Sequence, residues 1–249
     1  MKGFSFVLVT SLAISLSAAC APKRFPVAVV AKDHPATEWE DGGAEEEELD
    51  PFVPSYAPLT SADPIEMEGL RFAGVYREGA KTSYLAGTPK SFESVSALRD
   101  WLPSDDEMRD GDPAFTKTTA RVDLERHNVK VKAWIYAAKF EDDNDFHVII
   151  GTQPPGSAGT KYFNVEISGL PKKANAGTAQ LRKARKQFLT LFSEALPTKS
   201  TFMEYEPLAV IIEGSLYYDK AHGPEVGGPS WAKPNTAWEI HPVTKIRPQ

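Results

Sequence analysis

The segment from residue 129 to residue 150, VKVKAWIYAAKFEDDNDFHVII, constrains the fold more than any other part of the chain. Two sets of side chains alternate along its first half, with Val129, Val131, Ala133 and Ile135 on one face and Lys130, Lys132, Trp134 and Tyr136 on the other. This period of two is typical of a β-strand with two different faces. Residues 141–145, EDDND, are turn formers. The alternation resumes at Phe146, which leaves Asp145 and His147 together on the opposite face. The segment therefore predicts a β-hairpin.

Further elements follow the hairpin in a definite order. An apolar stripe at helical spacing predicts a helix over residues 178–196, and period-two alternation predicts three more strands. The expected strands span residues 119–140, 146–151, 161–168, 208–219 and 236–246. The resulting order, β-β-β-α-β-β, resembles the OB-fold, a five-stranded and partly open barrel. The resemblance covers residues 119–247. It predicts a mainly β protein with one or two helices, whose residues 117–249 form an OB-like barrel domain.

Two short motifs add a second resemblance. Residues 141–147, EDDNDFH, and residues 238–243, WEIHPV, resemble a group of bacterial proteins that pair an acidic turn-plus-histidine hairpin with a C-terminal Glu-x-His-Pro strand. This resemblance implies kinship and no established activity.

The N-terminus predicts export. Met1 and Lys2 are followed by FSFVLVTSLAISLS, an uncharged run that is too short to span a bilayer and that fits a signal peptide. The run ends in LSAAC, which resembles the lipobox of bacterial lipoproteins. The resemblance implies that Cys20 carries lipid, including palmitate, and anchors the chain to a membrane. Ala21 at the next position implies the outer membrane, by resemblance to enterobacterial lipoproteins. The alternative is ordinary secretory cleavage after Ala21, which would leave the protein secreted or periplasmic.

The residues between the signal peptide and the barrel divide into two parts. Residues 21–64 are rich in proline and contain the run Glu45 to Glu48, which predicts a disordered acidic tether or, alternatively, an acidic interaction tail. Residues 65–116 predict a small accessory α/β segment, with a strand over residues 67–76, a short partner at residues 84–85 and a helix over residues 91–102. The acidic residues from 105 to 112 are expected to form a solvated loop.

Lysines interleaved with aromatic residues suggest a binding face on the first strand. The proposed ligand-binding residues are Lys130, Lys132, Trp134 and Tyr136. Such a pattern suits stacking on the bases or sugars of a nucleic acid or polysaccharide, and an envelope protein is a third possible partner. Binding on this face requires Trp134 and Tyr136 to be exposed, whereas the competing interpretation places the aromatic rings in the barrel core. In OB-folds, the face of strands two and three also binds oligonucleotides and oligosaccharides.

Histidines and carboxylates at the strand ends suggest a second kind of site. The candidate metal ligands are Asp145, His147, Asp219, His222, Glu239 and His241. Imidazole and carboxylate groups bind zinc or manganese, and they also carry out acid–base chemistry. The competing interpretation is that the histidines bond turn carbonyls and have a structural role.

The expected function is that of an exported, lipid-anchored envelope protein that binds a ligand or partner. The alternative is a metal-dependent hydrolase or nuclease that uses His147, His222 and His241. The sequence assigns no catalytic residue, because it has neither a Gly-x-Ser-x-Gly motif nor a Cys–His pair for nucleophilic catalysis. The thermonuclease pattern also fails, because no arginine lies beside the acidic turn in the sequence.

Overall fold

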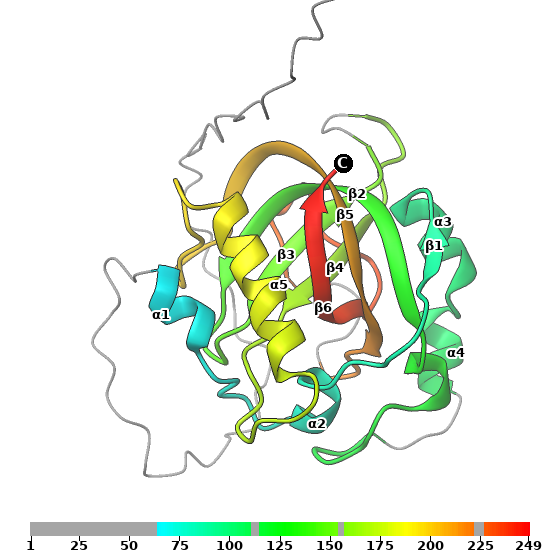
Figure 1. The fold of residues 1–249 in the computed structure, drawn as a ribbon. Helices are drawn as coiled ribbons and strands as arrows, with labels where there is room; N and C mark the ends of the chain where they lie inside the picture. Colours follow the sequence, from blue (N-terminus) through cyan, green and yellow to red (C-terminus); the bar gives the residue numbers. More distant parts are fainter. Residues whose placement is uncertain (1–63, 111–114, 154–156, 222–226) are drawn as a thin grey trace, which may run out of the picture.

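The computed structural model describes residues 64–110, 115–153, 157–221 and 227–249 (Figure 1). The predicted signal peptide with Cys20, the tether up to residue 63, and His222 lie outside the described residues. None of the helices in the described part of the chain is long and apolar enough to cross a membrane.

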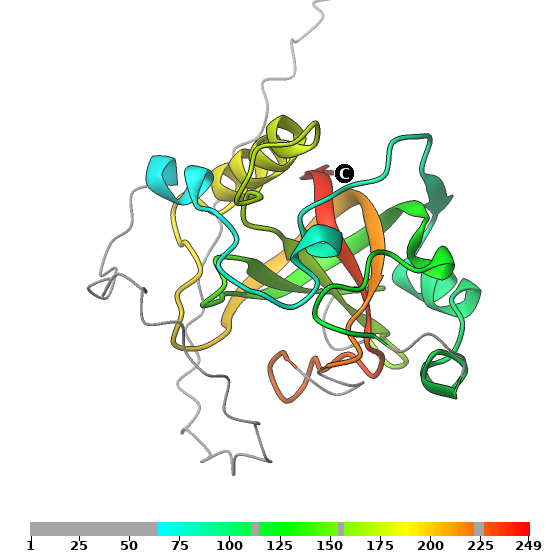
Figure 2. The same ribbon diagram turned by 90° about the horizontal axis from the view of Figure 1, so that it is seen from below.

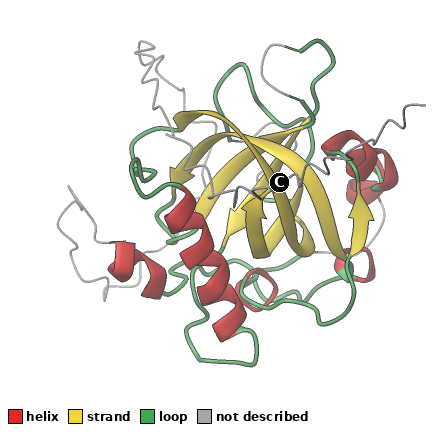
Figure 3. Ribbon diagram, turned by 45° about the horizontal axis from the view of Figure 1, so that its top comes forward, coloured by secondary structure: helices red, strands yellow, loops and turns green. Residues whose placement is uncertain are grey.

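A six-stranded sheet forms the centre of the molecule (Figures 1 and 3). Its strands are β1 (Lys90–Phe92), β2 (Asn128–Phe140), β3 (Phe146–Gly151), β4 (Tyr162–Ile167), β5 (Met203–Tyr218) and β6 (Trp238–Pro248). The strand order is β1-β2-β3-β4-β6-β5, and β5 also pairs with β2, so that the pairings form a ring. The β1–β2 and β4–β6 pairs are parallel, and the other pairs are antiparallel.

The prediction of a mainly β chain is confirmed, and the five expected strands occur in the expected order with α5 (Thr178–Leu191) between the third and the fourth. The bounds differ at several ends. The first of the five expected strands, β2, begins at Asn128 and not at residue 119, because the preceding residues turn through the 3-10 helix η1 (Asp123–Glu125). Strand β5 begins at Met203, five residues before the expected start at residue 208, because its N-terminal part still pairs with the end of β2.

The segment before the ring contains more helix than the sequence predicts. The described residues contain five α-helices, whereas one or two were expected. The four helices that precede α5 are α1 (Pro64–Gly69), α2 (Glu78–Lys81), α3 (Val95–Trp101) and α4 (Asp105–Asp110). The strand expected over residues 67–76 is wrong: its start lies in α1, and Arg71 makes an isolated bridge to Leu170. Residues 84–85, which were expected to form a short partner strand, are not a strand either.

The acidic stretch expected to be a loop begins as the helix α4. Its start is a capping box, in which the Ser104 hydroxyl accepts a hydrogen bond from Glu107 N at 3.2 Å and the Glu107 carboxylate accepts one from Ser104 N at 2.7 Å. Acidic side chains in the first turn also suit the positive end of the helix dipole. The same composition that suggested a solvated loop therefore favours a helix start.

One hydrophobic core joins the ring and the preceding segment. Val129, Val131 and Ile135 of β2 pack there with inward residues of the other strands and with Phe188 of α5. Residues of the first segment enter the same core, among them Met67, Phe92, Val95, Leu98 and Met108. Residues 64–110 thus pack directly on the ring. In the view of Figure 1, helices α1 and α5 lie to the left of the strands, and α3 and α4 lie to the right.

Three buried arginines hold the first segment against the ring. Arg77 forms a salt bridge of 2.6 Å with Glu125. Arg121 donates hydrogen bonds to the backbone oxygens of Ser83, at 2.9 Å, and His241 of β6, at 2.7 Å. Arg185 of α5 donates one of 2.7 Å to the backbone oxygen of Met67. These contacts keep the chain from α1 to α2 against the sheet, where Figure 2 shows it passing along one side of the strands.

Candidate functional site

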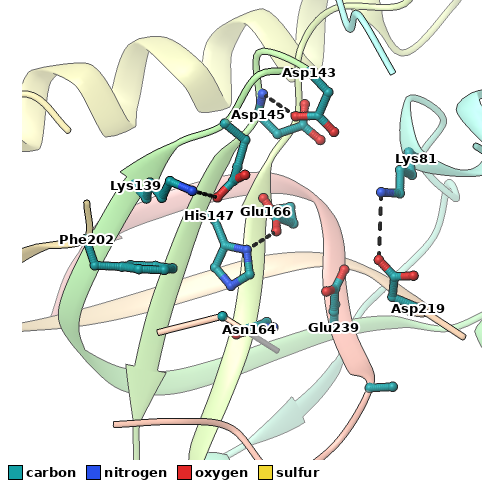
Figure 4. Close-up of a pocket in the computed structure, with 13 residues that line it drawn as sticks. Lys81, Lys139, Asp143, Asp145, His147, Asn164, Glu166, Phe202, Asp219 and Glu239 are labelled. Atoms are coloured by element: carbon teal, nitrogen blue, oxygen red, sulfur yellow. Dashed lines mark hydrogen bonds and ion pairs between the residues drawn. The ribbon is translucent and has the colours of Figure 1, made fainter. Parts of the chain in front are cut away.

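A polar cavity of about 310 Å³ lies on the outer face of the ring, over β3 and β4 (Figure 4). Its lining residues are Lys81, Lys139, Glu141, Asp143, Asp145, His147, Asn164, Glu166, Phe202, Asp219, Gly227, Ala237 and Glu239. They come from the sheet itself and from segments that cover it.

The strand register brings the sheet residues of the cavity together. Phe146 and Val148 of β3 point into the core, so His147 between them points outward. In the same way, Asn164 and Glu166 alternate with core residues on β4. His147 lies directly opposite Glu166 across the β3–β4 pair. Asn164 lies opposite Glu239 across the β4–β6 pair.

Segments outside the strands complete the cavity walls, among them the turn of residues 141–145 between β2 and β3. Lys81 comes from α2, Phe202 directly precedes β5, and Gly227 comes from the loop before β6. Gly227 has a φ of 84°, and a Cβ atom built there would lie 2.7 Å from His147 Cε1. Glycine at this position therefore allows both the left-handed backbone and the close approach of the loop to the imidazole.

His147 and Glu166 form the shortest ion pair within the cavity. His147 Nδ1 lies 2.9 Å from Glu166 Oε1, and the Phe202 ring packs edge-on against the imidazole with centroids 5.3 Å apart. Burial lowers the pKa of His147, but the charge and hydrogen bond of Glu166 more than offset this effect and raise it to about 9. Burial raises the pKa of the Glu166 carboxyl. The imidazole therefore carries its proton at neutral pH.

A second chain of buried groups lies behind the cavity. His241 Nε2 is 3.2 Å from Asp145 Oδ2, and His241 Nδ1 is 3.6 Å from Glu239 Oε2, but neither contact has hydrogen-bond geometry. The other oxygen of Asp145 accepts a hydrogen bond of 2.5 Å from Gly169 N. Burial raises the pKa of Asp145 to about 6 and also raises the pKa of Glu239.

Several buried polar atoms of the cavity have no hydrogen-bond partner among the residues that the structure describes. They are Asp145 Oδ2, His147 Nε2, Asn164 Oδ1, Glu166 Oε2 and Glu239 Oε2. Buried polar atoms in folded proteins are nearly always paired, so a group of unpaired ones at one place calls for an explanation such as a bound ligand or water.

The charges of the lining residues are unbalanced. Six of them carry carboxyl groups, whereas the cationic ones are Lys81, Lys139 and His147. Lys81 Nζ lies 3.8 Å from Asp219, and Lys139 Nζ lies 3.4 Å from Glu141. The cavity therefore has an excess of negative charge on its walls.

The structure gathers most of the candidate metal ligands named from the sequence. Asp145, His147, Asp219 and Glu239 line the cavity, and His241 lies behind it in contact with two of them. Within the described ranges, however, no group of three or more His, Cys, Asp or Glu residues is placed to hold a metal ion. The convergence of His147, His222 and His241, and the zinc or manganese site, stay predictions.

The face of β2 proposed from the sequence differs from the expected open surface. Tyr136 is fully buried, so the expectation that it is exposed is wrong. The register shifts between Ile135 and Ala137, and the rings of Trp231 and Tyr162 pack against Tyr136 with centroids 5.8 and 5.5 Å away.

The other residues of this β2 face retain some exposure, but the lysines are paired. Lys132 forms a 2.5 Å ion pair with Glu93, and Lys130 lies 3.9 Å from Glu213. Trp134 is only partly exposed. Acidic neighbours therefore neutralise the positive charge of the two lysines on this face.

Sequence reasoning missed Asn164, Glu166, Lys81 and Phe202 as members of the site. A signal exists for the first two, because they occupy the polar face of the strand expected over residues 161–168. Lys81 and Phe202 reach the cavity through tertiary packing and have no such signal. No protein-family model, curated protein or solved structure matches this chain.

Proposed function

We propose that the protein is an exported envelope lipoprotein, anchored through Cys20 to the outer membrane, whose ring of strands is an OB-like barrel that binds a polysaccharide. The strand pairings β2–β3–β4–β6–β5–β2 and the position of α5 between β4 and β5 support the OB-like barrel. The cavity lies over β3 and β4, the second and third strands of the ring, and this is the face with which OB-folds bind oligonucleotides and oligosaccharides.

The observation that carries the binding proposal is the group of unpaired buried oxygens in the cavity. Hydroxyl groups of a sugar supply the donors that Asn164, Glu166 and Glu239 lack. The excess of carboxylates disfavours a nucleic acid, whose phosphates would be repelled. A volume of about 310 Å³ lies at the lower end of small-molecule sites, which suits one sugar unit better than a protein surface.

Affinity electrophoresis in gels that contain soluble polysaccharides tests the proposal. We expect at least one polysaccharide to retard the full-length protein, and Asn164→Leu to abolish the retardation while Trp134→Ala leaves it unchanged. The reverse pattern would place binding on the β2 face, and no retardation by any polysaccharide would contradict the proposal.

The anchor is tested separately by detergent phase partition of the protein from cells that export it. We expect the wild type in the detergent phase and Cys20→Ser in the aqueous phase. If both are aqueous, ordinary cleavage and release replaces the lipid anchor.

A metal-dependent hydrolase is the second candidate, favoured by the gathering of Asp145, His147, Asp219 and Glu239 around one cavity. Zinc or manganese at 100 times its dissociation constant would stabilise the fold by about 2.7 kcal/mol, which a melting curve detects. A rise in the wild-type midpoint that His222→Ala abolishes would support this candidate. An equal response in both proteins, or none, would contradict a site that uses His222.

A further inference from the structure

We infer that the cavity binds an organic ammonium group, which lies among the carboxylates of Asp145, Glu166 and Glu239. The inference rests on the proposed function in one respect, because it assigns the ligand chemistry of the same cavity. It goes further by naming a cationic group as the feature that the site selects.

The three carboxylates are built into the protein interior. Their residues are 1% (Asp145), 6% (Glu166) and 5% (Glu239) exposed. Each has one oxygen without a hydrogen bond, and each lines the cavity. Asp145 ends the turn directly before β3, Glu166 lies on β4 and Glu239 lies on β6, so that the three side chains come from separate segments around the cavity (Figure 4). Buried carboxylates normally have a cationic or hydrogen-bonding partner for each oxygen. Asp145 Oδ2 and Glu239 Oε2 face His241 at 3.2 and 3.6 Å without hydrogen-bond geometry, and Glu166 Oε2 has no hydrogen-bond partner among the described residues.

The cationic side chains that line the cavity already have other partners. Lys81 contacts Asp219, Lys139 contacts Glu141, and His147 contacts the other oxygen of Glu166. A primary ammonium group brings one positive charge and three N–H donors. It can therefore donate a charge-assisted hydrogen bond to Glu166 Oε2 and further bonds to neighbouring acceptors, which a neutral hydroxyl cannot do with the same strength.

The geometry favours an organic cation over a metal ion. The described carboxylates and histidines are not placed to hold a metal. The cavity of about 310 Å³ has room for a ligand body beside the charged group, and the Phe202 ring gives one wall an apolar surface. An alkyl chain or a sugar ring that carries an amine fits a cavity with carboxylates on the sheet and an aromatic ring on one wall.

Titration calorimetry on the full-length protein in mild detergent at pH 8 tests the inference. The probes are 1,5-diaminopentane and glucosamine, each with a neutral control of matched shape, pentane-1,5-diol and glucose, and zinc chloride as the metal alone. We expect at least one amine to bind about tenfold or more tightly than its control. We also expect Glu239→Gln to weaken amine binding by about tenfold, with Glu166→Gln as a second variant. Glu213→Gln, which lies outside this cavity, should leave the affinity unchanged.

The outcomes separate the inference from the proposed function. Glucosamine binding supports both, and binding of the diamine alone supports the ammonium site while contradicting a polysaccharide ligand. Equal affinity for amines and neutral controls overturns the inference and leaves polysaccharide binding in place. Binding of zinc alone also overturns it, in favour of a metal site.

Discussion

Two buried polar clusters in this protein have opposite hydrogen-bonding states. In the first, Arg77 and Glu125 are both completely shielded from solvent. The guanidinium donates two hydrogen bonds to Glu125 and three to backbone oxygens, so all five of its N–H groups are used. The rings of Phe115 and Tyr217 lie on it at 4.7 and 4.6 Å.

In the second cluster, at the cavity, one oxygen each of Asp145, Glu166 and Glu239 has no hydrogen bond from the described part of the chain. The ring of Tyr217 links the two clusters, because it also packs on His241 with centroids 5.4 Å apart. The comparison contrasts two uses of buried polarity: the fully paired cluster holds the chain together, whereas we propose that the cavity keeps its groups ready for a ligand at a cost in stability.

The largest effect is expected at the paired cluster. Glu125→Ala leaves the Arg77 guanidinium and Tyr218 N without their acceptor. Removing one partner of a buried ion pair destabilises a protein by about 3–5 kcal/mol. Urea unfolding of the wild type and the variant measures this loss, and a loss under about 1 kcal/mol would show that the cluster is not structural.

The His147–Glu166 pair should make stability depend on pH. The pKa of His147 is raised to about 9, above the usual value near 6.5, so its contribution is complete below pH 6.5 and is lost as the pH rises to about 9. The loss amounts to roughly 3 kcal/mol at most. Groups around the cavity that act on His147 are Glu141, Glu166 and Glu239.

The check compares unfolding free energies of the wild type and His147→Gln from pH 6 to pH 9.5. The difference between them should shrink across this window. A constant difference would show that the imidazole is not held in its charged form.

At the cavity cluster, we expect one substitution to increase the free energy of unfolding. Glu239→Gln keeps the shape of the side chain but removes a buried charge, so the free protein should gain about 1 kcal/mol at pH 8 and little at pH 5. The sign follows from the raised pKa of Glu239, because the wild type loses stability as its carboxyl ionises and glutamine does not titrate. Melting curves at both pH values measure the gain, and a clear loss at pH 8 would place Glu239 among the structural residues.

The smallest effect is expected at a solvent-exposed pair. The Lys132–Glu93 ion pair is short, at 2.5 Å, but its side chains are 47% and 80% exposed. Exposed pairs contribute about 0–1 kcal/mol, and salt screens them. Glu93→Ala should therefore change the unfolding free energy by less than about 1 kcal/mol at physiological salt, which is the control for the Glu125 experiment.

Much of the strand arrangement, and part of the site, could be predicted from the sequence. The expected strand over residues 146–151 has the predicted bounds, from Phe146 to Gly151. Asp145 and His147, which the alternation placed on one face, both line the cavity. Tyr136 was misplaced, because a register shift next to it and two covering rings bury it. Neither cause is visible in the alternation of β2.

The sequence by itself determined the order of strands and helix from β2 to β6, because the period of two or of 3.6 is a local property of neighbouring residues. It also determined which side chains share a strand face, as with Asn164 and Glu166. Only the tertiary structure decided that Lys81, Phe202 and Gly227 close a cavity over that face. Contacts between residues distant in the chain depend on how segments pack, and whether a buried carboxylate finds a partner depends on those contacts alone.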